Sequence, residues 1–275
     1  MLSASVRIVV LASGSAGNAS LFEAEGSSVL VDAGIAPRTL AAKLAATGAR
    51  RPDAIIVTHA HQDHVGHCLR LARGLKIPIY ASEATARCPA LQGRAEVEIF
   101  SAREPFAIGA LTIAPTPLPH DAAQVAIVVE GGGRRAAIVT DLGEVPPSLA
   151  AHLARCEVVL IESNHDAEML ENGPYPAFLK RRIASARGHL SNAQAHALLR
   201  ALPGETHTVV LMHLSERNNR PEIALESAHD ALSGRRIRLL AATQDACLTL
   251  DATPAERWPP LSGSRGKAAQ LSLFG

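Results

Sequence analysis

Residues 59–64 carry an unusual density of side chains that can bind a metal ion or transfer a proton. His59, His61, Asp63 and His64 stand within six positions, directly after the apolar run Ile55–Val57, which predicts a buried strand. Neutral imidazole and ionised carboxylate are suitable ligands for Zn²⁺ and similar divalent ions. A single histidine on a loop is more often a surface or capping residue, but four donors at one strand end favour a metal site.

Strands and helices must position these donors, and both leave patterns in the sequence. Short apolar runs bounded by Gly, Pro or Asp predict strands at 6–12, 29–32, 54–58, 77–81, 96–100, 111–114, 125–130, 135–140, 158–162, 209–212 and 246–250. Helical patterns fall at 37–47, 65–73, 147–155, 176–185, 191–202 and 221–233. Both halves mix strands and helices in a similar way, which is compatible with an old duplication and predicts layered sheets with helices outside.

The composition excludes several classes of function. The chain of 275 residues has 27 Lys and Arg against 26 Asp and Glu, so its charge does not support a broad electrostatic grip on nucleic acid or an anionic membrane. With 2 Tyr and 1 Trp, stacking along an aromatic groove is not expected to be the main way of binding bases. The four cysteines form no C-x-x-C pair and no apolar run is long enough to cross a membrane, so we predict a cytoplasmic protein.

The H-x-H-x-D-H run resembles the signature of the metallo-β-lactamase fold superfamily, and the other elements of that signature are also present, in the expected order along the chain. They stand at the ends of predicted strands: Asp32, His120, Asp141 and His213. The resemblance covers about residues 6–252. It implies an α/β fold, a four-layer αββα sandwich of two mixed sheets with outer helices.

Carried over position by position, the resemblance implies a centre for two divalent ions, Zn²⁺ or Mn²⁺. One ion would be held by His59, His61 and His120, the other by Asp63, His64 and His213, with Asp141 as the bridge and Asp32 as support. Two such ions can share a hydroxide, which would be the nucleophile, and can clamp a displacement at phosphorus. Asp63 could also orient that hydroxide or accept its proton.

Finer motifs resemble one branch of this superfamily, the small YycJ/WalJ-like members linked to 5′ to 3′ exonuclease action on DNA. They cover residues 11–18, 161–166, 175–192 and 213–221. Glu162 and His189 are similar to the Glu and His of the tRNase Z branch, where a His oriented by a carboxylate can protonate the leaving oxygen. Because the fold hosts lactam, thioester and phosphoester hydrolysis alike, the branch decides the predicted substrate.

Three further residues are candidate substrate contacts. Ser15 and Asn18 belong to a small-residue turn that could cradle a phosphate, although a plain turn after a strand fits equally well. Asn218 precedes Pro221 and could contact substrate or only turn the chain. Residues 180–187 are rich in Lys and Arg, a pattern typical of a solvated face that could also follow a nucleic-acid backbone.

Residues 253–275 predict a flexible tail behind a catalytic domain of residues 1–252. The tail ends in a peptide that resembles the one by which bacterial DNA-processing proteins bind the replicative sliding clamp. Its expected contact residues are Gln270, Leu271, Leu273 and Phe274. Apolar side chains on a tether can insert into a preformed groove, but the same residues could also be a chance terminus or pack on their own domain.

The predicted function is that of a dinuclear metal-dependent phosphodiesterase acting as a 5′ to 3′ exonuclease on DNA. Two alternatives stay open. The same centre could hydrolyse RNA, a small phosphodiester or a thioester, or the protein could be a non-catalytic, clamp-bound accessory factor on DNA.

Overall fold

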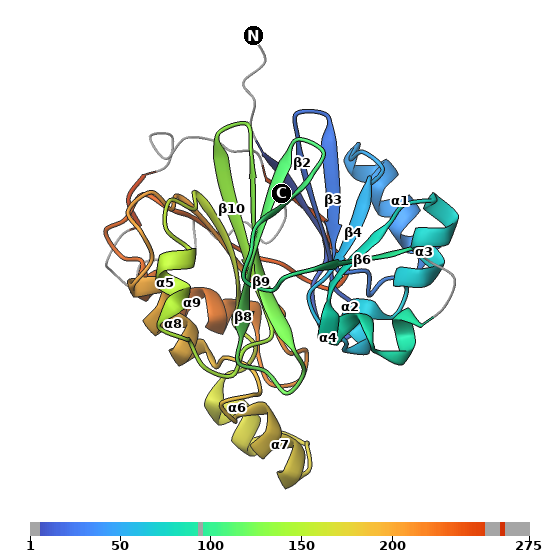
Figure 1. The fold of residues 1–275 in the computed structure, drawn as a ribbon. Helices are drawn as coiled ribbons and strands as arrows, with labels where there is room; N and C mark the ends of the chain where they lie inside the picture. The colour runs from blue at the N-terminus through green and yellow to red at the C-terminus, as the bar shows by residue number, and fades with distance from the viewer. Residues whose placement is uncertain (1–5, 93–95, 251–258, 262–275) are drawn as a thin grey trace.

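Two mixed sheets of seven strands pack face to face in the computed structural model, which describes residues 6–92, 96–250 and 259–261 (Figure 1). The first sheet has the order β14 (Leu248–Leu250), β1 (Arg7–Ala12), β2 (Ala19–Ala24), β3 (Ser27–Val31), β4 (Ala54–Val57), β5 (Ile79–Ser82) and β6 (Val97–Phe100). The second has the order β13 (Arg238–Ala241), β12 (Thr208–Met212), β11 (Val158–Glu162), β10 (Arg134–Val139), β9 (Gln124–Gly131), β8 (Leu111–Leu118) and β7 (Phe106–Ile108).

Helices cover the outer face of each sheet. On the first sheet these are α1 (Pro37–Thr47) and α3 (Cys68–Leu75), with the short α2 (Gln62–Val65) and α4 (Glu83–Ala86) at strand ends. On the second sheet they are α5 (Ser148–His152), α8 (Asn192–Arg200) and α9 (Pro221–Ala231). The predicted four-layer αββα sandwich is therefore confirmed. Helices α6 (Ala167–Asn172) and α7 (Ala177–Ile183) project beyond these layers at the bottom of Figure 1.

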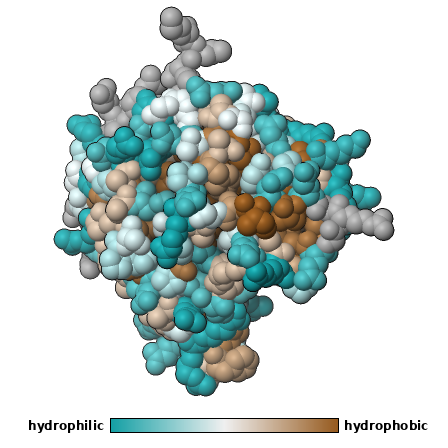
Figure 2. Space-filling view, viewed as in Figure 1, coloured by the Kyte–Doolittle hydropathy of each residue, from teal (hydrophilic) through white to brown (hydrophobic). Residues whose placement is uncertain are grey.

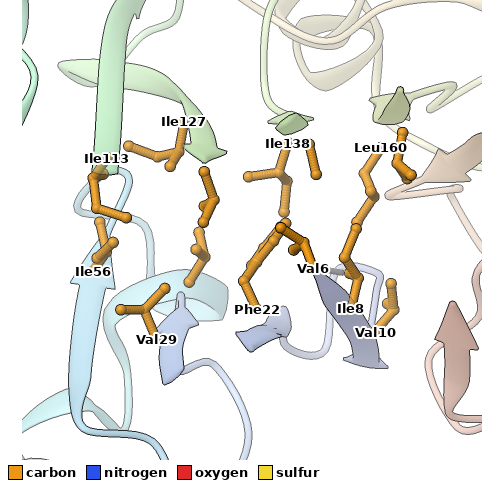
Figure 3. Packing of buried hydrophobic residues seen from close by; sticks show 14 of the residues in the cluster. Val6, Ile8, Val10, Phe22, Val29, Ile56, Ile113, Ile127, Ile138 and Leu160 are labelled. Carbon is orange, nitrogen blue, oxygen red and sulfur yellow. The ribbon is translucent and has the colours of Figure 1, made fainter. Parts of the chain in front are cut away.

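The main core lies between the sheets, because their central strands are buried on both faces and the sequences of these strands are nearly continuous apolar runs. In β1, Ile8 and Val10 face the opposite sheet while Val9 and Leu11 face the helices. Figure 3 shows the inner layer, where side chains such as Phe22 meet residues of the second sheet. This packing fixes the two sheets relative to each other, and with them any site built from both.

The site is built at one edge of the sandwich. Strands β3, β4, β5 and β6 run parallel in the first sheet, as do β10, β11, β12 and β13 in the second. Because parallel strands end at the same edge of a sheet, the polar residues that follow them are brought together there.

Three strands have no counterpart among the predicted ones: β2, β7 and β13. Strand β2 carries the polar residues Ser20 and Glu23, which interrupt its apolar pattern, yet it is buried throughout as a central strand. The sequence predicts that the catalytic domain ends at residue 252. Leu261 lies beyond this boundary, but it is buried in the second-sheet core and its backbone forms hydrogen bonds with Gly234 and Arg235. Within the described residues, no helix has the length and apolar character needed to cross a membrane.

Candidate metal centre

Three histidines converge from the two sheets to form a first donor group. His59 and His61 follow β4, and His120 follows β8 of the second sheet. Their ligand atoms lie within 4.8 Å of one another, and Nε2 of His120 lies 3.2 Å from Nδ1 of His61. This is the set expected for one metal ion.

Each of these imidazoles has its other nitrogen fixed by a neighbour. The contacts are Thr58 Oγ1 to His59 Nδ1 at 3.1 Å, Asp121 Oδ1 to His61 Nε2 at 3.0 Å, and Gly188 O to His120 Nδ1 at 3.0 Å. Because the Gly188 carbonyl can only accept, Nδ1 of His120 carries the proton and Nε2 is left for a ligand bond. Such outer contacts fix the ring orientation and tautomer of metal-binding histidines.

A second donor group consists of Asp63, His64 and His213. Oδ2 of Asp63 lies 3.3 Å from Nε2 of both histidines. Nδ1 of His64 is 2.7 Å from Oδ2 of Asp32, whose other oxygen, Oδ1, accepts a hydrogen bond from the backbone N–H of Thr58. Asp32 thus contacts the nitrogen of His64 that faces away from the donor group.

The loop that carries Asp63 comes so close to its neighbour that only glycine fits. A Cβ atom at Gly34 would lie 1.8 Å from the Asp63 carbonyl oxygen. The same carbonyl accepts a hydrogen bond from the backbone N–H of Asn18. Gly34, next to the structural Asp32 and Ala33, therefore permits the close approach that places this ligand loop.

Asp141 stands between the two groups. It is 1% exposed, and its Oδ2 lies 3.2 Å from Nε2 of His64 without forming a hydrogen bond. Asp141 also forms a donor group with His59 and His64, one residue from each expected metal position.

The donor atoms fit a bound cation. Nε2 of His59 and Oδ2 of Asp141 are both buried and have no hydrogen-bond partner. Buried polar atoms are normally paired, because leaving one unpaired costs about 1–3 kcal/mol. Imidazole nitrogens and carboxylate oxygens grouped in this way are a donor set for divalent ions.

Glu162, at the end of β11, connects two histidines of the site. Its Oε1 lies 2.7 Å from Nδ1 of His189 and 3.2 Å from Nδ1 of His213, while Oε2 accepts the backbone N–H groups of Leu142 and Leu190. Burial alone would raise the pKa of Glu162, but the charge of His189 and its hydrogen bond lower it to about 2. Burial would lower the pKa of His189, yet the charge of Glu162 and their hydrogen bond raise it overall.

Three residues of the site adopt a left-handed backbone conformation at the end of a strand. The φ angles are 62° at Asp32, 58° at Asp141 and 53° at His213. Non-glycine residues seldom adopt positive φ, and Asp and His are among the more tolerant types. The turn at each strand end directs the side chain into the site, and the backbone strain is maintained by the surrounding contacts.

The candidate substrate contacts lie in different surroundings. Ser15 is exposed at the tip of its turn. Asn18 is 5% exposed, and its amide contacts Oδ2 of Asp63 at 3.2 Å and Nε2 of His64 at 3.0 Å, so it holds two residues of the second donor group in place. Asn218 is 0% exposed and its side chain points to Ser215 inside the domain, so the structure does not place it where substrate could touch it.

Asp121 has a place in the site that the sequence did not reveal. One carboxylate oxygen contacts His61, and the other accepts from the guanidinium group of Arg182 at 2.7 Å. Burial would raise the pKa of Asp121, but the Arg182 hydrogen bond and nearby histidines lower it. Its position directly after His120 was the available signal, but sequence alone gives no reason to pair it with His61.

Comparison with known proteins assigns the chain to a family. A profile described as "Beta-lactamase superfamily domain" matches residues 27–214. The chain belongs to the β-lactamase superfamily. Among curated relatives, "Exodeoxyribonuclease YycJ" of Bacillus anthracis is 35% identical over 231 residues, which cover 81% of this chain and 88% of the relative. "Exodeoxyribonuclease WalJ" of Streptococcus pneumoniae is 34% identical over 226 residues, 78% of this chain and 84% of the relative.

Solved structures agree on the fold. The metallo-β-lactamase fold protein YhfI from Bacillus subtilis aligns with a TM-score of 0.70 at 20% identity, covering 90% of this chain and all of that one. Zn²⁺-bound PqqB from Methylobacterium extorquens aligns with a TM-score of 0.67 at 16% identity, covering 89% of this chain and all of that one. The family and the donor groups together make this chain a metal-dependent hydrolase that binds divalent metal ions.

Proposed function

We propose that this chain is an exodeoxyribonuclease that removes nucleotides from DNA, starting at the 5′ end, with two divalent ions. The observation that carries the proposal is the pair of three-residue donor groups, together with Asp141, which is grouped with one residue of each, His59 and His64. The names of the relatives at 34–35% identity supply the DNA substrate. His59, His61 and His120 would hold one ion, and Asp63, His64 and His213 the other.

When bound, two ions of this kind lower the pKa of a water molecule and stabilise negative charge around phosphorus. The protein supplies the proton transfers. Burial would raise the pKa of Asp63, but hydrogen bonds from His213 and His64 keep it far below its usual value. Asp63 is therefore ionised at neutral pH, and its Oδ2 can orient the attacking water.

His189 is the group we assign to protonate the leaving oxygen. Glu162 holds its Nδ1, which leaves Nε2 as the donor. The raised pKa keeps the ring protonated closer to neutral pH, the range in which a general acid is useful. The side chain of His189 is 20% exposed, so a bound phosphodiester can reach it. Glu162 is fully buried, and its role is to orient His189.

Product analysis on end-labelled DNA tests this function. The protein, stripped and reloaded with Zn²⁺ or with Mn²⁺, is given single- and double-stranded DNA labelled at either end, the same sequence as RNA, and a thioester. We expect mononucleotides from the 5′ label at early times with one of the two metals. Faster cleavage of RNA, or thioester turnover with intact DNA, would overturn the assignment to DNA.

We also propose that the C-terminal peptide binds the DNA sliding clamp. Gln270, Leu271, Leu273 and Phe274 lie outside the described residues, so this rests on the sequence of the peptide alone. A tethered peptide would raise the local concentration of the enzyme on clamp-loaded DNA. Deletion of residues 270–275 should abolish clamp capture in a pull-down while turnover of short oligonucleotides is unchanged; equal capture would refute the proposal.

A further inference from the structure

Helices α6 and α7 form a projection, residues 167–183, that extends beyond the layers of the sandwich (Figure 1). Figure 2 shows this part of the surface as mostly hydrophilic, with a hydrophobic area at its outer end. None of the residues of α7 is buried. Phe178 on α7 is 67% exposed, the most exposed large hydrophobic side chain of the described residues. One exposed ring is common on a protein surface, so its meaning depends on the residues around it.

Arg182 connects this projection to the metal centre. Its guanidinium nitrogens Nε and Nη2 each lie 2.7 Å from Oδ2 of Asp121. The other oxygen of Asp121 is 3.0 Å from Nε2 of His61. One acidic side chain therefore joins α7 to a metal ligand, which places the α7 residues around Arg182 beside the reaction centre.

The same side of α7 carries an aromatic ring and two positive charges. Residues three and four positions apart are neighbours on a helix, so Phe178 adjoins both Arg181 and Arg182. We call these three residues the α7 face. Arg181 is exposed and has no hydrogen bond or ion pair within the part of the chain that the structure describes. Helix α7 contains no acidic residue; the acidic groups Glu168 and Glu171 stand on α6.

We propose that the α7 face binds a single strand of DNA next to the bond that is cut, a proposal that rests on the exonuclease function. Phe178 would stack on a base that has left the duplex, and Arg181 would pair with a neighbouring phosphate. Aromatic stacking combined with positive charge is the usual means of binding single strands without sequence preference. The chain has a net charge of only +1, so the positive charge of the α7 face would provide local attraction for DNA phosphates beside the metal centre.

The chemistry of the face favours a nucleic-acid strand over a protein helix as its occupant. A groove for an amphipathic helix presents several apolar positions, whereas this face offers one ring flanked by guanidinium groups. Its continuity with the metal centre through Asp121 means that a strand lying on it leads directly toward the metal ligands.

Steady-state kinetics of Phe178→Ala with single-stranded DNA of two to twelve nucleotides tests the proposal. We expect KM to rise about tenfold for the longer strands, and less for dinucleotides that cannot reach α7. Turnover of bis-p-nitrophenyl phosphate should be unchanged, because this small substrate does not touch the face. Phe178→Tyr should restore the KM of the longer strands, since the ring is retained.

Two control variants remove an apolar side chain and a positive charge elsewhere on the surface, as Phe178→Ala and Arg181→Gln do on the α7 face. Ile99→Ala removes another exposed apolar side chain, on β6, and Arg200→Gln removes an exposed charge on α8. Neither should change KM for DNA, whereas Arg181→Gln should raise it severalfold and reduce its dependence on salt.

The outcomes separate this proposal from the proposed function. If the wild-type protein degrades DNA and Phe178→Ala keeps the same KM at every length, the α7 face is not a strand-binding surface. A uniform loss of activity on both DNA and bis-p-nitrophenyl phosphate would also contradict it, because that result indicates damage to the centre. Failure of the wild-type protein to cut any DNA would instead refute the exonuclease function on which the proposal rests.

Discussion

The buried carboxylate of Glu162 lies 2.7 Å from Nδ1 of His189. This contact engages Nδ1 of His189 and leaves Nε2 available, as the proposed role of proton donor requires. A positioned proton donor contributes about 10²–10⁴-fold to a hydrolytic rate. The relationship therefore predicts how the two residues divide their roles.

Replacement of His189 by Ala should lower kcat on DNA by about 10²–10⁴-fold. The loss should be much smaller for bis-p-nitrophenyl phosphate, because nitrophenolate leaves without protonation. Elemental analysis should find the same metal content as in the wild-type protein. Equal losses on both substrates would contradict the assignment of His189 as the proton donor.

The Glu162→Gln variant should show the effect of positioning without loss of the imidazole. Gln keeps the size of the side chain but removes the charge that raises the pKa of His189. We expect the alkaline limb of the kcat profile on DNA to move to lower pH, since His189 would lose its proton earlier. An unchanged profile would show that Glu162 does not act through His189.

Loss of the Asp141 carboxylate should remove binding of two metal ions. Asp141→Asn is the sharper variant, because Asn tolerates the φ of 58° at this position while lacking the charge that two cations would share. We expect at most one equivalent of metal by elemental analysis, with the fold retained by circular dichroism. A variant that still binds two equivalents would contradict the bridging role.

Asp121 should influence metal affinity without being a ligand. Its contact with Nε2 of His61 is of the outer kind whose removal weakens metal binding by about 10–100-fold. Asp121→Ala should show this loss in a competition titration with a chelator. Arg182→Gln, which leaves Asp121 in contact with His61, should change metal affinity far less; an equal loss in both variants would mean that the effect does not pass through His61.

The metal-free protein should lose stability as the pH rises. Burial would lower the pKa of His213, but the charge of Asp141 and hydrogen bonds with Asp63 and Glu162 raise it to about 10. A raised folded-state pKa stabilises the protein fully below the ordinary value of 6.5, and the contribution disappears as the pH passes through about 10. The lowered pKa of Glu162 adds stability above 4.5 that is lost toward about 2.

Thermal unfolding of the metal-free protein between pH 5 and 10 measures this effect. Tm should fall above pH 7, and added Zn²⁺ should raise Tm more at pH 8 than at pH 6, because metal binding requires neutral imidazole. In His213→Asn the fall should be much smaller. A Tm of the metal-free protein that stays constant from pH 6 to 10 would contradict the raised pKa.

Much of the sandwich could be predicted from sequence because its central strands are buried on both faces. The run at 54–57 is apolar throughout and predicts the strand β4. The residues after it can be predicted as metal donors from their types alone. Strands β7 and β13 were not predicted, each for a different reason. The first is only three residues long, and the second begins beside the cluster Arg235, Arg236 and Arg238, whose charges hide its apolar residues.

The parts of the site that sequence could not reveal depend on contacts between distant residues. Asp121 binds His61 from 60 positions away, and the Gly188 carbonyl reaches His120 across 68. Asn18 was recognised as a site residue, but its role depends on packing against Asp63 and His64, which no local pattern encodes. The types of the residues indicate which side chains can bind a metal ion. The contacts that orient those side chains form only after the two sheets have packed, so no local sequence pattern indicates them.

The donors are divided between the sheets: His59, His61, Asp63 and His64 belong to the first, while His120, Asp141 and His213 follow strands of the second. The chain passes from one sheet to the other between β6 and β7, at residues 101–105. Fragments cut there would each hold an incomplete set of ligands. A mixture of the two fragments would therefore degrade DNA only after they reassociate. The nuclease activity of such a mixture would report how far the two sheets have assembled.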